Sequence, residues 1–309
     1  MTSPQTKFKP RTDYCGRFAP SPTGPLHFGS LVAAFGSFLR ARSQGGRWLV
    51  RIEDIDTPRT VPGAARDQLD SLCHFGLEWD GEVLWQSHRI EVYRAALARL
   101  ERAGCVFACR CSRSELDGDP HRRCIGTRHD GPAAIRLRAP DHDIRFVDAI
   151  RGPQVQNLAR EVGDFVLWRA DGLVAYQLAV VVDDAEQGIT EVVRGADLID
   201  STARQIALQS ALGLPHPAYA HLPLALDAHG HKLGKSQQAL ALDRSRPLPA
   251  LRQAWRFLGQ ASGVLDAETR LAGLLDAAIT HFELWRIPKA DRSICHALGD
   301  PDGTRARGV

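Results

Sequence analysis

The chain has 309 residues, of which 44% are hydrophobic and 24% are charged, so it can build the core of one large domain or two modest ones. With a formal net charge of +3, the chain is not strongly basic, as many nucleic-acid-binding proteins are. A local basic face is still compatible with this charge. Because we find no apolar leader and no run of about 18 apolar residues, we expect a cytoplasmic, monomeric protein without a membrane span.

The first hundred residues alternate strand and helix patterns. Residues 14–19 predict a short strand, a Pro/Gly-rich turn follows, and residues 27–44 have the apolar spacing of a helix. A second strand is expected within residues 46–54. Amphipathic helices are expected at 62–75 and 87–103, with Gly76 and Gly104 as their C-terminal stops. Such alternation predicts a parallel α/β sheet.

The alternation of strand and helix patterns is interrupted between residues 105 and 160 and then resumes. Short β-like pieces surround a cysteine-rich loop between 105 and 160, which predicts an inserted subdomain. Strand and helix signals resume up to about residue 214, and residues 248–258 and 266–286 are expected to be helical. The expected organisation has four parts: 1–104 and 161–245 as the two halves of one catalytic domain, 105–160 as the insertion, and 246–309 as a short helical C-terminal region.

Two loops carry groups suited to phosphate binding. Residues 20–30 (PSPTGPLHFGS) lie between the first strand and the first helix, where backbone N–H groups and the positive end of the helix attract an anion. Far downstream, HKLGKSQ places Lys232 and Lys235 in one loop, where their ammonium groups can follow the charge of a transferring phosphoryl group. Taken singly, the first segment could be a plain surface turn and the second a solvated basic loop.

Together these segments resemble a known family. GRFAPSPTGPLHFGSL resembles the HIGH signature of class I aminoacyl-tRNA synthetases in its glutamate-specific form, KLGKS resembles the matching KMSKS loop, and RIEDID resembles the second strand of the glutamyl-tRNA synthetases. The resemblance spans residues 14–240 and implies a Rossmann-like parallel sheet, with an inserted zinc-loop, acceptor-like subdomain.

The resemblance also implies that ATP, with Mg²⁺, is bound by His27, Gly29, Lys232, Lys235 and Ser236, of which His27 and the two lysines would be catalytic. The motifs depart from their usual form at Phe28, Ser30, Leu233 and Gly234.

A glutamate pocket must hold two carboxylates and one ammonium group, so it needs arginine forks and an acid. By the resemblance, Glu53 would bind the ammonium group, and Arg17 and Arg194 would bind the carboxylates, in an order that the sequence leaves open. The glutamate-binding set implied by the resemblance is Arg17, Phe18, Ala19, Pro20, Ser21, Glu53, Tyr176 and Arg194.

Each polar member of this set also has a structural interpretation. Glu53 could be a partner of Arg51 or Arg59, Tyr176 a core residue with a solvated hydroxyl, Arg194 an ion-pair partner of Asp197 or Asp200, and Arg17 a solvated residue at a strand end. These interpretations compete with a role in binding at every position.

The chain has seven cysteines, and Cys109, Cys111 and Cys124 lie close together with His121. Three thiolates and one imidazole form a suitable tetrahedral Zn²⁺ site, and a structural zinc ion would fold a loop that has little apolar content. Structural or redox-active thiols with a solvated histidine are the alternative. The resemblance implies a zinc loop here with a tyrosine as its fourth ligand, at a place where this chain has Pro120; His121 is therefore expected to replace it, and Asp119 or water could also complete the shell.

The chain continues for about 70 residues after the KMSKS-like loop, where a full-length glutamyl-tRNA synthetase would continue into a helical anticodon-binding domain. The resemblance therefore favours tRNA-independent activation of L-glutamate, followed by its transfer to the queuosine base of tRNA(Asp). RNA contacts from Arg122, Arg123 and Arg128 are expected, although these arginines could simply be solvated. A compact synthetase that charges a tRNA 3′ end, a non-catalytic binding protein and an unrelated nucleotidyltransferase remain as alternatives.

Overall fold

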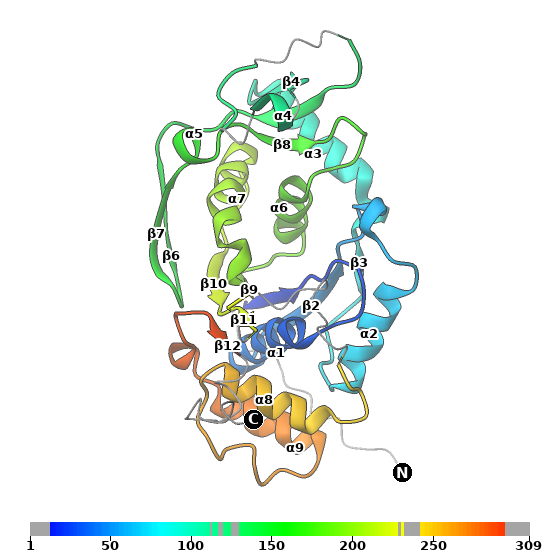
Figure 1. Ribbon diagram of the computed structural model, residues 1–309, viewed down its shortest axis with the longest axis vertical. Helices are drawn as coiled ribbons and strands as arrows, with labels where there is room; N and C mark the ends of the chain where they lie inside the picture. The colour runs from blue at the N-terminus through cyan, green and yellow to red at the C-terminus, as the bar shows by residue number, and fades with distance from the viewer. Residues whose placement is uncertain are drawn as a thin grey trace, which may run out of the picture.

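The computed structural model describes residues 13–111, 113–116, 120–124, 130–227, 230–231 and 242–293. Several residues singled out in the sequence lie outside these ranges: Asp119, Arg128, Lys232, Leu233, Gly234, Lys235 and Ser236. Figure 1 shows the arrangement of the described elements. Their strands are β1 (Cys15–Phe18), β2 (Arg47–Ile52), β3 (Leu84–Trp85), β4 (Val106–Cys109), β5 (Ala134–Leu137), β6 (Asp143–Asp148), β7 (Gly152–Asn157), β8 (Phe165–Trp168), β9 (Glu191–Gly195), β10 (Ala218–Leu222), β11 (Ala225–Leu226) and β12 (Arg292–Ser293).

The helices alternate with these strands over much of the chain. They are α1 (Phe28–Ser43), α2 (Ala64–His74), α3 (Ile90–Arg102), α4 (Arg113–Leu116), α5 (Leu158–Glu161), α6 (Tyr176–Glu186), α7 (Ile199–Leu212), α8 (Pro247–Phe257) and α9 (Leu271–His281). Short 3-10 turns lie at Thr57–Arg59, Gln86–Arg89, Ala196–Leu198 and Leu284–Arg286.

Parallel strands form the centre of the molecule. β1, β2 and β3 pair in parallel in the order β1-β2-β3, and β9 and β10 continue in parallel to β6 in the order β7-β6-β10-β9. The two groups meet where β9 lies beside β1, and the backbone N–H of Thr190 donates to the carbonyl oxygen of Cys15 at 2.9 Å. Among the described strands of this sheet, the β6–β7 hairpin at the edge is the one antiparallel pair. The predicted parallel α/β sheet is therefore confirmed.

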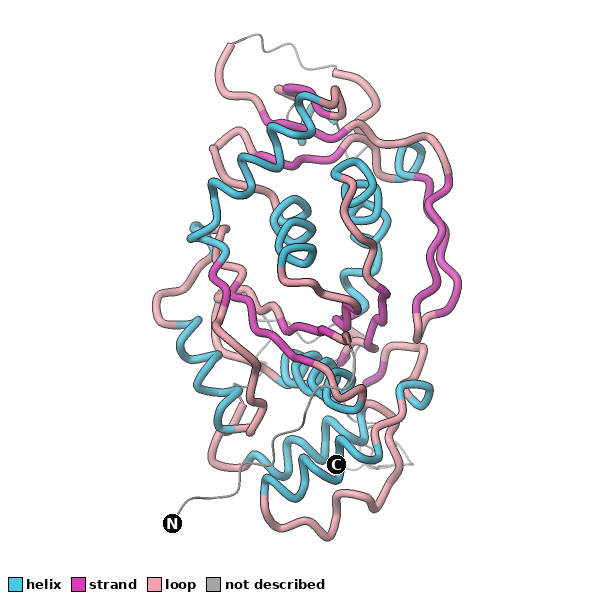
Figure 2. The backbone as a smooth tube through the Cα atoms, turned by 180° about the vertical axis from the view of Figure 1, so that it is seen from behind, coloured by secondary structure: helices cyan, strands magenta, loops and turns pink. Residues whose placement is uncertain are grey.

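Helices cover both faces of this sheet. Figures 1 and 2 show the strands between α1 on one side and α6 and α7 on the other, with α8 and α9 packed beyond α1. α1 approaches β10 closely, because a Cβ atom at Gly36 would lie 2.8 Å from Cδ1 of Leu222. Apolar residues of α1, α8 and α9 form one core with β1 and β2, while α3, α6 and α7 form a second core with β5 and β8.

The cysteine-rich segment belongs to a separate small sheet. β4, β5 and β8 pair antiparallel in the order β4-β5-β8 at one end of the molecule. The β6–β7 hairpin leaves this region and reaches the central sheet through β10, where Tyr219 pairs with Asp148. The segment between α3 and α6 therefore contributes to both sheets.

Most predicted elements are observed within two or three residues of their expected ends. The glycines expected to stop α2 and α3 do so, since Gly76 and Gly104 both have φ of +67°. One expectation was wrong and one strand was missed. The helix expected at 266–286 spans only 271–281, because Arg270 and Phe282 at its ends are extended, and the strand Ala218–Leu222 was not anticipated.

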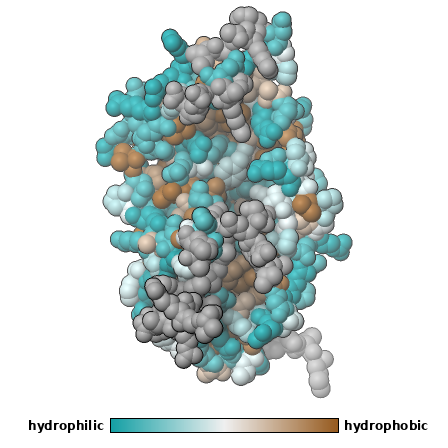
Figure 3. Space-filling view, in the orientation of Figure 1, coloured by the Kyte–Doolittle hydropathy of each residue, from teal (hydrophilic) through white to brown (hydrophobic). Residues whose placement is uncertain are grey.

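Among the described residues, no helix combines the length and the apolar character that a membrane crossing requires. The face of the molecule seen in Figure 3 is mainly hydrophilic, and its brown hydrophobic atoms occur in small groups.

Candidate active site

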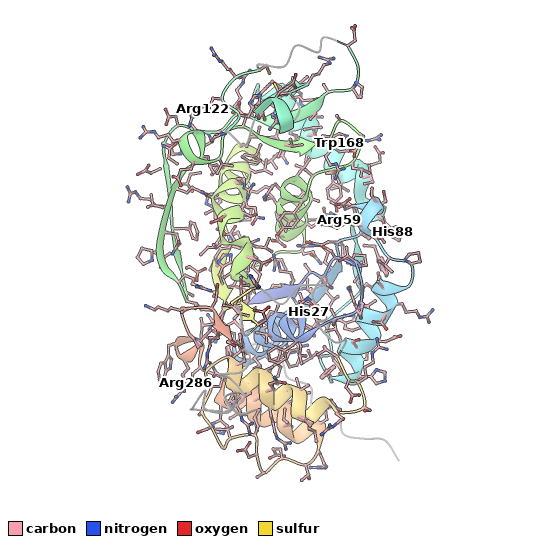
Figure 4. The ribbon with its side chains drawn as sticks, viewed as in Figure 1. His27, Arg59, His88, Arg122, Trp168 and Arg286 are labelled. Carbon is pink, nitrogen blue, oxygen red and sulfur yellow. The ribbon has the colours of Figure 1, made fainter. Side chains whose placement is uncertain are left out.

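A cavity of about 570 Å³ opens where β1 and β10 end and α1 begins. The loop after β1, the first turn of α1 and the ends of β9 and β10 supply most of its wall. Its lining includes Phe18, Pro20, Ser21, His27, Gly29 and Ser30 from the first motif, and Gln68, Gly195, Asp197 and Leu222–Ala225 from other segments. Figure 4 labels His27 at the end of α1 near the middle of the molecule.

His27 is the N-cap residue of α1. Its backbone is extended, and its Nδ1 accepts a hydrogen bond from the backbone N–H of Ser30 at 3.4 Å. With Nδ1 as an acceptor, a neutral imidazole carries its proton on Nε2 and presents a donor there. The N-terminus of α1 adds its positive dipole end, so this part of the cavity suits an anion.

Gly29 determines where the His27 ring can lie. A Cβ atom at this position would come within 3.2 Å of Cε1 and 3.3 Å of Nδ1 of His27. The absence of a side chain therefore lets the imidazole fold back over the first turn of the helix.

Gln68 of α2 fixes the loop after β1. This buried side chain donates from Nε2 to the carbonyl oxygens of Ser21 and Gly24, at 3.1 and 2.7 Å. The same loop is tied to the end of β2, since the backbone N–H of Glu53 donates to Pro20 O at 3.0 Å. Gln68 carries no motif, and the sequence analysis missed it.

Arg17 and Arg51 share one buried carboxylate. Arg17 donates to both oxygens of Asp184, from Nε at 3.1 Å and from Nη2 at 3.3 Å, and Arg51 donates from Nη1 to Oδ1 at 2.7 Å. Burial alone would raise the pKa of Asp184, but the two guanidinium groups hold it below its ordinary value. Arg17 is only 3% exposed, so it is not a solvated residue at a strand end.

Arg17 bonds to Asp184 through Nε and Nη2, and among the described contacts its Nη1 makes no hydrogen bond. Glu53 lies near the same group and accepts from Arg51 Nη2 at 3.4 Å. Burial raises the pKa of Glu53, with Asp184 and Asp183 adding to the effect and Arg51 and Arg17 opposing it. A raised pKa shows that this carboxylate would gain from a further cation.

Arg194 of β9 contacts Tyr176, the first residue of α6. It donates from Nη1 to Tyr176 Oη at 3.3 Å and to Gln205 Oε1 at 2.8 Å, and it is 5% exposed. Because Tyr176 accepts this bond, its own O–H remains a donor. Burial raises the pKa of Tyr176, and the charges of Glu53 and Asp184 add to this effect while those of Arg194 and Arg17 oppose it.

The structure thus brings together most of the residues singled out by sequence. Phe18, Pro20, Ser21, His27 and Gly29 line the cavity, and Arg17, Glu53, Tyr176 and Arg194 form the polar cluster beside it. Ala19 is half-buried between the two groups. Arg194 does not pair with Asp197 or Asp200 among the described contacts, whereas Glu53 does meet Arg51.

Asp183 and Asp184 are the main functional candidates that the sequence analysis missed. Asp183 is fully buried and accepts hydrogen bonds from Gln86 at 2.7 Å, Arg89 at 2.8 Å and Tyr93 at 2.8 Å. Two adjacent acids inside the apolar run of α6 were the available signal, because buried charges require partners.

Four side chains in the small sheet could hold a metal ion. The ligand atoms of Cys109, Cys111, His121 and Cys124 all lie within 4.8 Å of one another, and Cys109 Sγ is 3.3 Å from Nε2 of His121. Burial and the adjacent thiols of Cys109 and Cys111 raise the pKa of Cys124 to about 11. This donor set of three thiols and one imidazole fits a tetrahedral ion, which would relieve the crowding of thiolates.

His121 is held in place by the residues before β8. Its backbone forms a bridge with Gly163, and its carbonyl oxygen accepts the N–H of Asp164 at 2.7 Å. Gly163 has φ of +76°, and a Cβ atom there would lie 2.4 Å from the backbone nitrogen of His121. A glycine is required for this close approach.

Arg122 and Arg123 are exposed beside the cysteine cluster. Arg122, labelled near the upper end of the molecule in Figure 4, donates to the carbonyl oxygens of Ala159 and Arg160 at 3.3 and 2.9 Å.

Residues 15–248 match the model of the family described as tRNA synthetases class I (E and Q), catalytic domain. A "Glutamyl-Q tRNA(Asp) synthetase" from Xanthomonas campestris pv. campestris (strain 8004) is 58% identical over 282 residues, which cover 89% of this chain and 94% of that protein. The chain belongs to the glutamyl-Q tRNA(Asp) synthetase family of class I. A further member of the glutamyl-Q tRNA(Asp) synthetase family, from Neisseria meningitidis serogroup C (strain 053442), is 52% identical and matches over its whole length and 93% of this chain.

Among solved structures, the chain is similar to a glutamate tRNA ligase from Elizabethkingia meningosepticum, described in complex with its amino acid. The TM-score is 0.77 at 27% identity, and the match covers 92% of this chain and 67% of the ligase. These comparisons confirm the class I fold and the resemblance to glutamyl-tRNA synthetases that the motifs predict.

Proposed function

We propose that this chain activates L-glutamate with ATP to form glutamyl-adenylate, without needing tRNA, and then transfers the glutamyl group to the queuosine base in the anticodon loop of tRNA(Asp). The observation that carries the proposal is one polar cluster, with two arginines, an acid and a tyrosine, beside a cavity at the N-terminus of α1. The names of relatives at 52–58% identity supply the acceptor.

In the proposed pocket, each end of glutamate meets a group of opposite charge. Glu53 would bind the ammonium group, because its buried carboxylate has a raised pKa and only partial compensation from Arg51. The Nη1 edge of Arg17 would bind one carboxylate. Arg194 and the O–H of Tyr176 would bind the other, with the hydroxyl donating to it. Phe18, Ala19, Pro20 and Ser21 would line the remaining wall.

The ATP phosphates would lie at the other end of the cavity. The Nε2–H of His27 and the N-terminus of α1 favour a triphosphate there, and Gly29 lines the same cavity. Lys232, Lys235 and Ser236 would complete this site. The described residues on either side of their loop support this, since Ala225 lines the cavity and the N–H of Leu242 donates to Leu26 O at 3.2 Å.

The first step forms an acyl phosphate. A carboxylate oxygen of glutamate attacks the α-phosphorus of ATP, and the bond to the bridging oxygen of pyrophosphate breaks. His27 and the two lysines stabilise the charge that develops on the phosphate oxygens, and Mg²⁺ bound with ATP would neutralise the departing pyrophosphate. In the second step, a hydroxyl of the queuosine cyclopentene ring attacks the glutamyl carbonyl, an ester forms, AMP leaves with the bonding electrons, and the hydroxyl proton passes to the AMP phosphate or to water.

We further propose that Cys109, Cys111, His121 and Cys124 bind a structural Zn²⁺ ion. The four donors fit tetrahedral coordination, and Asp164 lies behind His121. The exposed Arg122 and Arg123 are candidates for RNA contacts. The four-part division at residues 104, 160 and 245, the monomeric state and the cytoplasmic location stay predictions.

The test is glutamate-dependent ATP–pyrophosphate exchange without RNA, followed by transfer of labelled glutamate to tRNA(Asp) with and without queuosine. We expect exchange without RNA and transfer only to the queuosine-containing tRNA. Transfer should survive periodate cleavage of the 3′ ribose diol when the queuosine diol is protected.

The similarity to a glutamate tRNA ligase favours one second candidate, a compact synthetase that charges a tRNA 3′ end. Exchange that requires tRNA, or transfer that periodate abolishes, would support this alternative. The absence of any exchange would reject both activities and leave a binding protein.

A further inference from the structure

Three buried groups on three adjacent strands form a continuous chain of hydrogen bonds. Asp148 ends β6, His221 lies in β10 and Arg194 lies in β9, and they are 1%, 0% and 5% exposed. The carboxylate Oδ2 of Asp148 lies 2.6 Å from Nδ1 of His221, and Nε2 of His221 lies 3.0 Å from Nε of Arg194. The chain ends at a proposed glutamate-binding guanidinium.

The partners of Asp148 determine which nitrogen of His221 carries the proton. Oδ1 accepts three backbone N–H groups, from Ile150 at 3.0 Å, Arg151 at 2.8 Å and His221 at 3.2 Å. Oδ2 is left to accept from Nδ1 of the imidazole. A neutral His221 therefore has its proton on Nδ1 and a lone pair on Nε2, which accepts the Nε–H of Arg194.

The charges around His221 keep it in this neutral state. Burial lowers the pKa of His221, and the nearby Arg194 and Arg151 add to this effect while Asp148 opposes it. The ring also stacks on Tyr219, with 6.2 Å between ring centroids and 8° between planes. Nε2 of His221 also lies 3.4 Å from Oγ1 of Thr202, whose hydroxyl can donate to the same lone pair.

Arg194 uses every one of its N–H groups. Beyond its bonds to His221, Tyr176 and Gln205, its Nη2 donates to the carbonyl oxygen of Leu198 at 3.2 Å and to Oγ1 of Thr202 at 3.0 Å. In the free protein, five donors with five acceptors fix the plane and the rotation of the guanidinium, and a glutamate carboxylate would replace Tyr176 at Nη1, which is the longest of these bonds. His221 supplies the only acceptor for Nε among the described contacts.

We propose that Asp148 and His221 are positioning residues, which set the orientation of Arg194 for glutamate binding through the tautomer of His221. The inference rests on the proposed role of Arg194 in the glutamate pocket. Through Asp148, the strand β6, which follows the cysteine loop and precedes β8 in sequence, would then affect the glutamate pocket.

The substitution Asp148→Asn tests the tautomer with almost no change of shape. The three backbone donors hold the amide oxygen at the Oδ1 position, so the NH₂ group faces Nδ1 of His221. Nδ1 must then accept, the imidazole proton moves to Nε2, and an N–H group faces the Nε–H of Arg194. Asp143→Asn is the matched control, because it makes the same change on the same strand at an exposed residue.

The first readout is the ¹⁵N spectrum of histidine-labelled protein. The His221 signal, assigned by its loss in His221→Gln, should show a protonated Nδ1 and an unprotonated Nε2 in the wild type and the reverse in Asp148→Asn. Asp143→Asn should match the wild type. This readout does not depend on any activity.

The second readout is kinetic. In ATP–pyrophosphate exchange, Asp148→Asn should raise the KM for glutamate about tenfold to a hundredfold, as expected for a disturbed hydrogen bond to a charged group, with the KM for ATP changed less than about twofold. A glutamine at position 221 can accept from Arg194 through its amide oxygen and has no second tautomer. In the His221→Gln variant, Asp148→Asn should therefore raise the KM for glutamate much less than it does in the wild type.

Two results would overturn the proposal: an unchanged His221 tautomer in Asp148→Asn, or equal rises in the KM for glutamate and for ATP. If wild-type protein shows no glutamate-dependent exchange, the proposed function fails instead. The ¹⁵N spectra would then still decide whether Asp148 sets the tautomer that faces Arg194.

Discussion

Nδ1 of His121 lies 3.0 Å from Oδ2 of Asp164, and Oδ1 of the same carboxylate accepts the backbone N–H of Ala139 at 2.8 Å. The carboxylate therefore directs Nε2 of His121 toward the three thiols. In metal sites, a carboxylate behind a histidine fixes the tautomer and makes the imidazole a better ligand.

We expect Asp164→Asn to lower zinc affinity about 10- to 100-fold, because an NH₂ group replaces one of the two accepting oxygens, so either His121 or Ala139 loses its acceptor. Competition with a coloured chelator measures this affinity directly. Asp141→Asn is a suitable control, since Asp141 is exposed, pairs with Arg160 and is not one of the four ligands. Unchanged zinc affinity in Asp164→Asn would show that Asp164 has no such role.

Zinc binding should release protons. The pKa of Cys124 is raised to about 11, so its thiol is protonated at neutral pH and must lose its proton to ligate. Calorimetry in two buffers with different ionisation enthalpies should detect proton release near pH 7, and zinc affinity should fall as the pH is lowered. Removal of the ion by a chelator should take up the same number of protons.

Asp184→Asn should destabilise the fold by about 3–5 kcal/mol, because it leaves the buried Arg17 and Arg51 without their shared counter-charge. Urea unfolding measures the change in the free energy of unfolding. The exposed Asp171→Asn should change it by less than about 0.5 kcal/mol.

The same carboxylate gives stability a pH dependence. The folded pKa of Asp184 lies below its ordinary value, so its contribution is present above about pH 4 and is lost as the pH falls through the folded pKa. Asp184→Asn should remove this part of the acid sensitivity. An identical acid response in the wild type and the variant would contradict the assignment.

Glutamate binding should weaken in mild acid. Only ionised Glu53 can bind an ammonium group, and burial raises its pKa above 4.5 in the free protein. The affinity for glutamate should therefore be full above this raised pKa and fall as the pH passes through it. Glu53→Gln should bind weakly at every pH and lose this transition, which a titration of glutamate KM against pH would detect.

Gly29→Ala should separate activity from stability. The added methyl group must push the His27 ring by a few tenths of an ångström, so we expect the exchange rate to fall about twofold to fivefold. Replacing a helical glycine with alanine should leave the unfolding temperature unchanged or slightly higher. A parallel loss of both would indicate a packing defect rather than a displaced imidazole.

Local patterns predicted much of this molecule. The strand, turn and helix around His27 depend on neighbours in sequence, and so do the glycine stops of α2 and α3. The cysteine cluster was also accessible, because its four ligands lie within one short segment. The lysines of the KMSKS-like loop remain a prediction.

Contacts between residues far apart in the sequence could not be predicted. Asp184 meets Arg17 across 167 residues, and Asp148 meets His221 across 73, so no spacing rule could join them. β10 was missed because its five residues lie between prolines and offer little periodicity, although it pairs with both β9 and β6. The helix predicted at 266–286 is longer than the observed one, because Arg270 and Phe282 adopt extended backbones that the composition of the segment does not reveal.

The bridge between His121 and Gly163 has a consequence for the small sheet as a whole. Cys109 ends β4, and Gly163 directly precedes the residues that lead into β8, while β5 separates these two strands. An ion held by Cys109 and His121 would join the outer strands by a second route and turn an open three-stranded sheet into a ring. A ring resists fraying at either edge, so loss of the ion should increase the deuterium exchange of amides in β8, an outer strand that supplies no ligand.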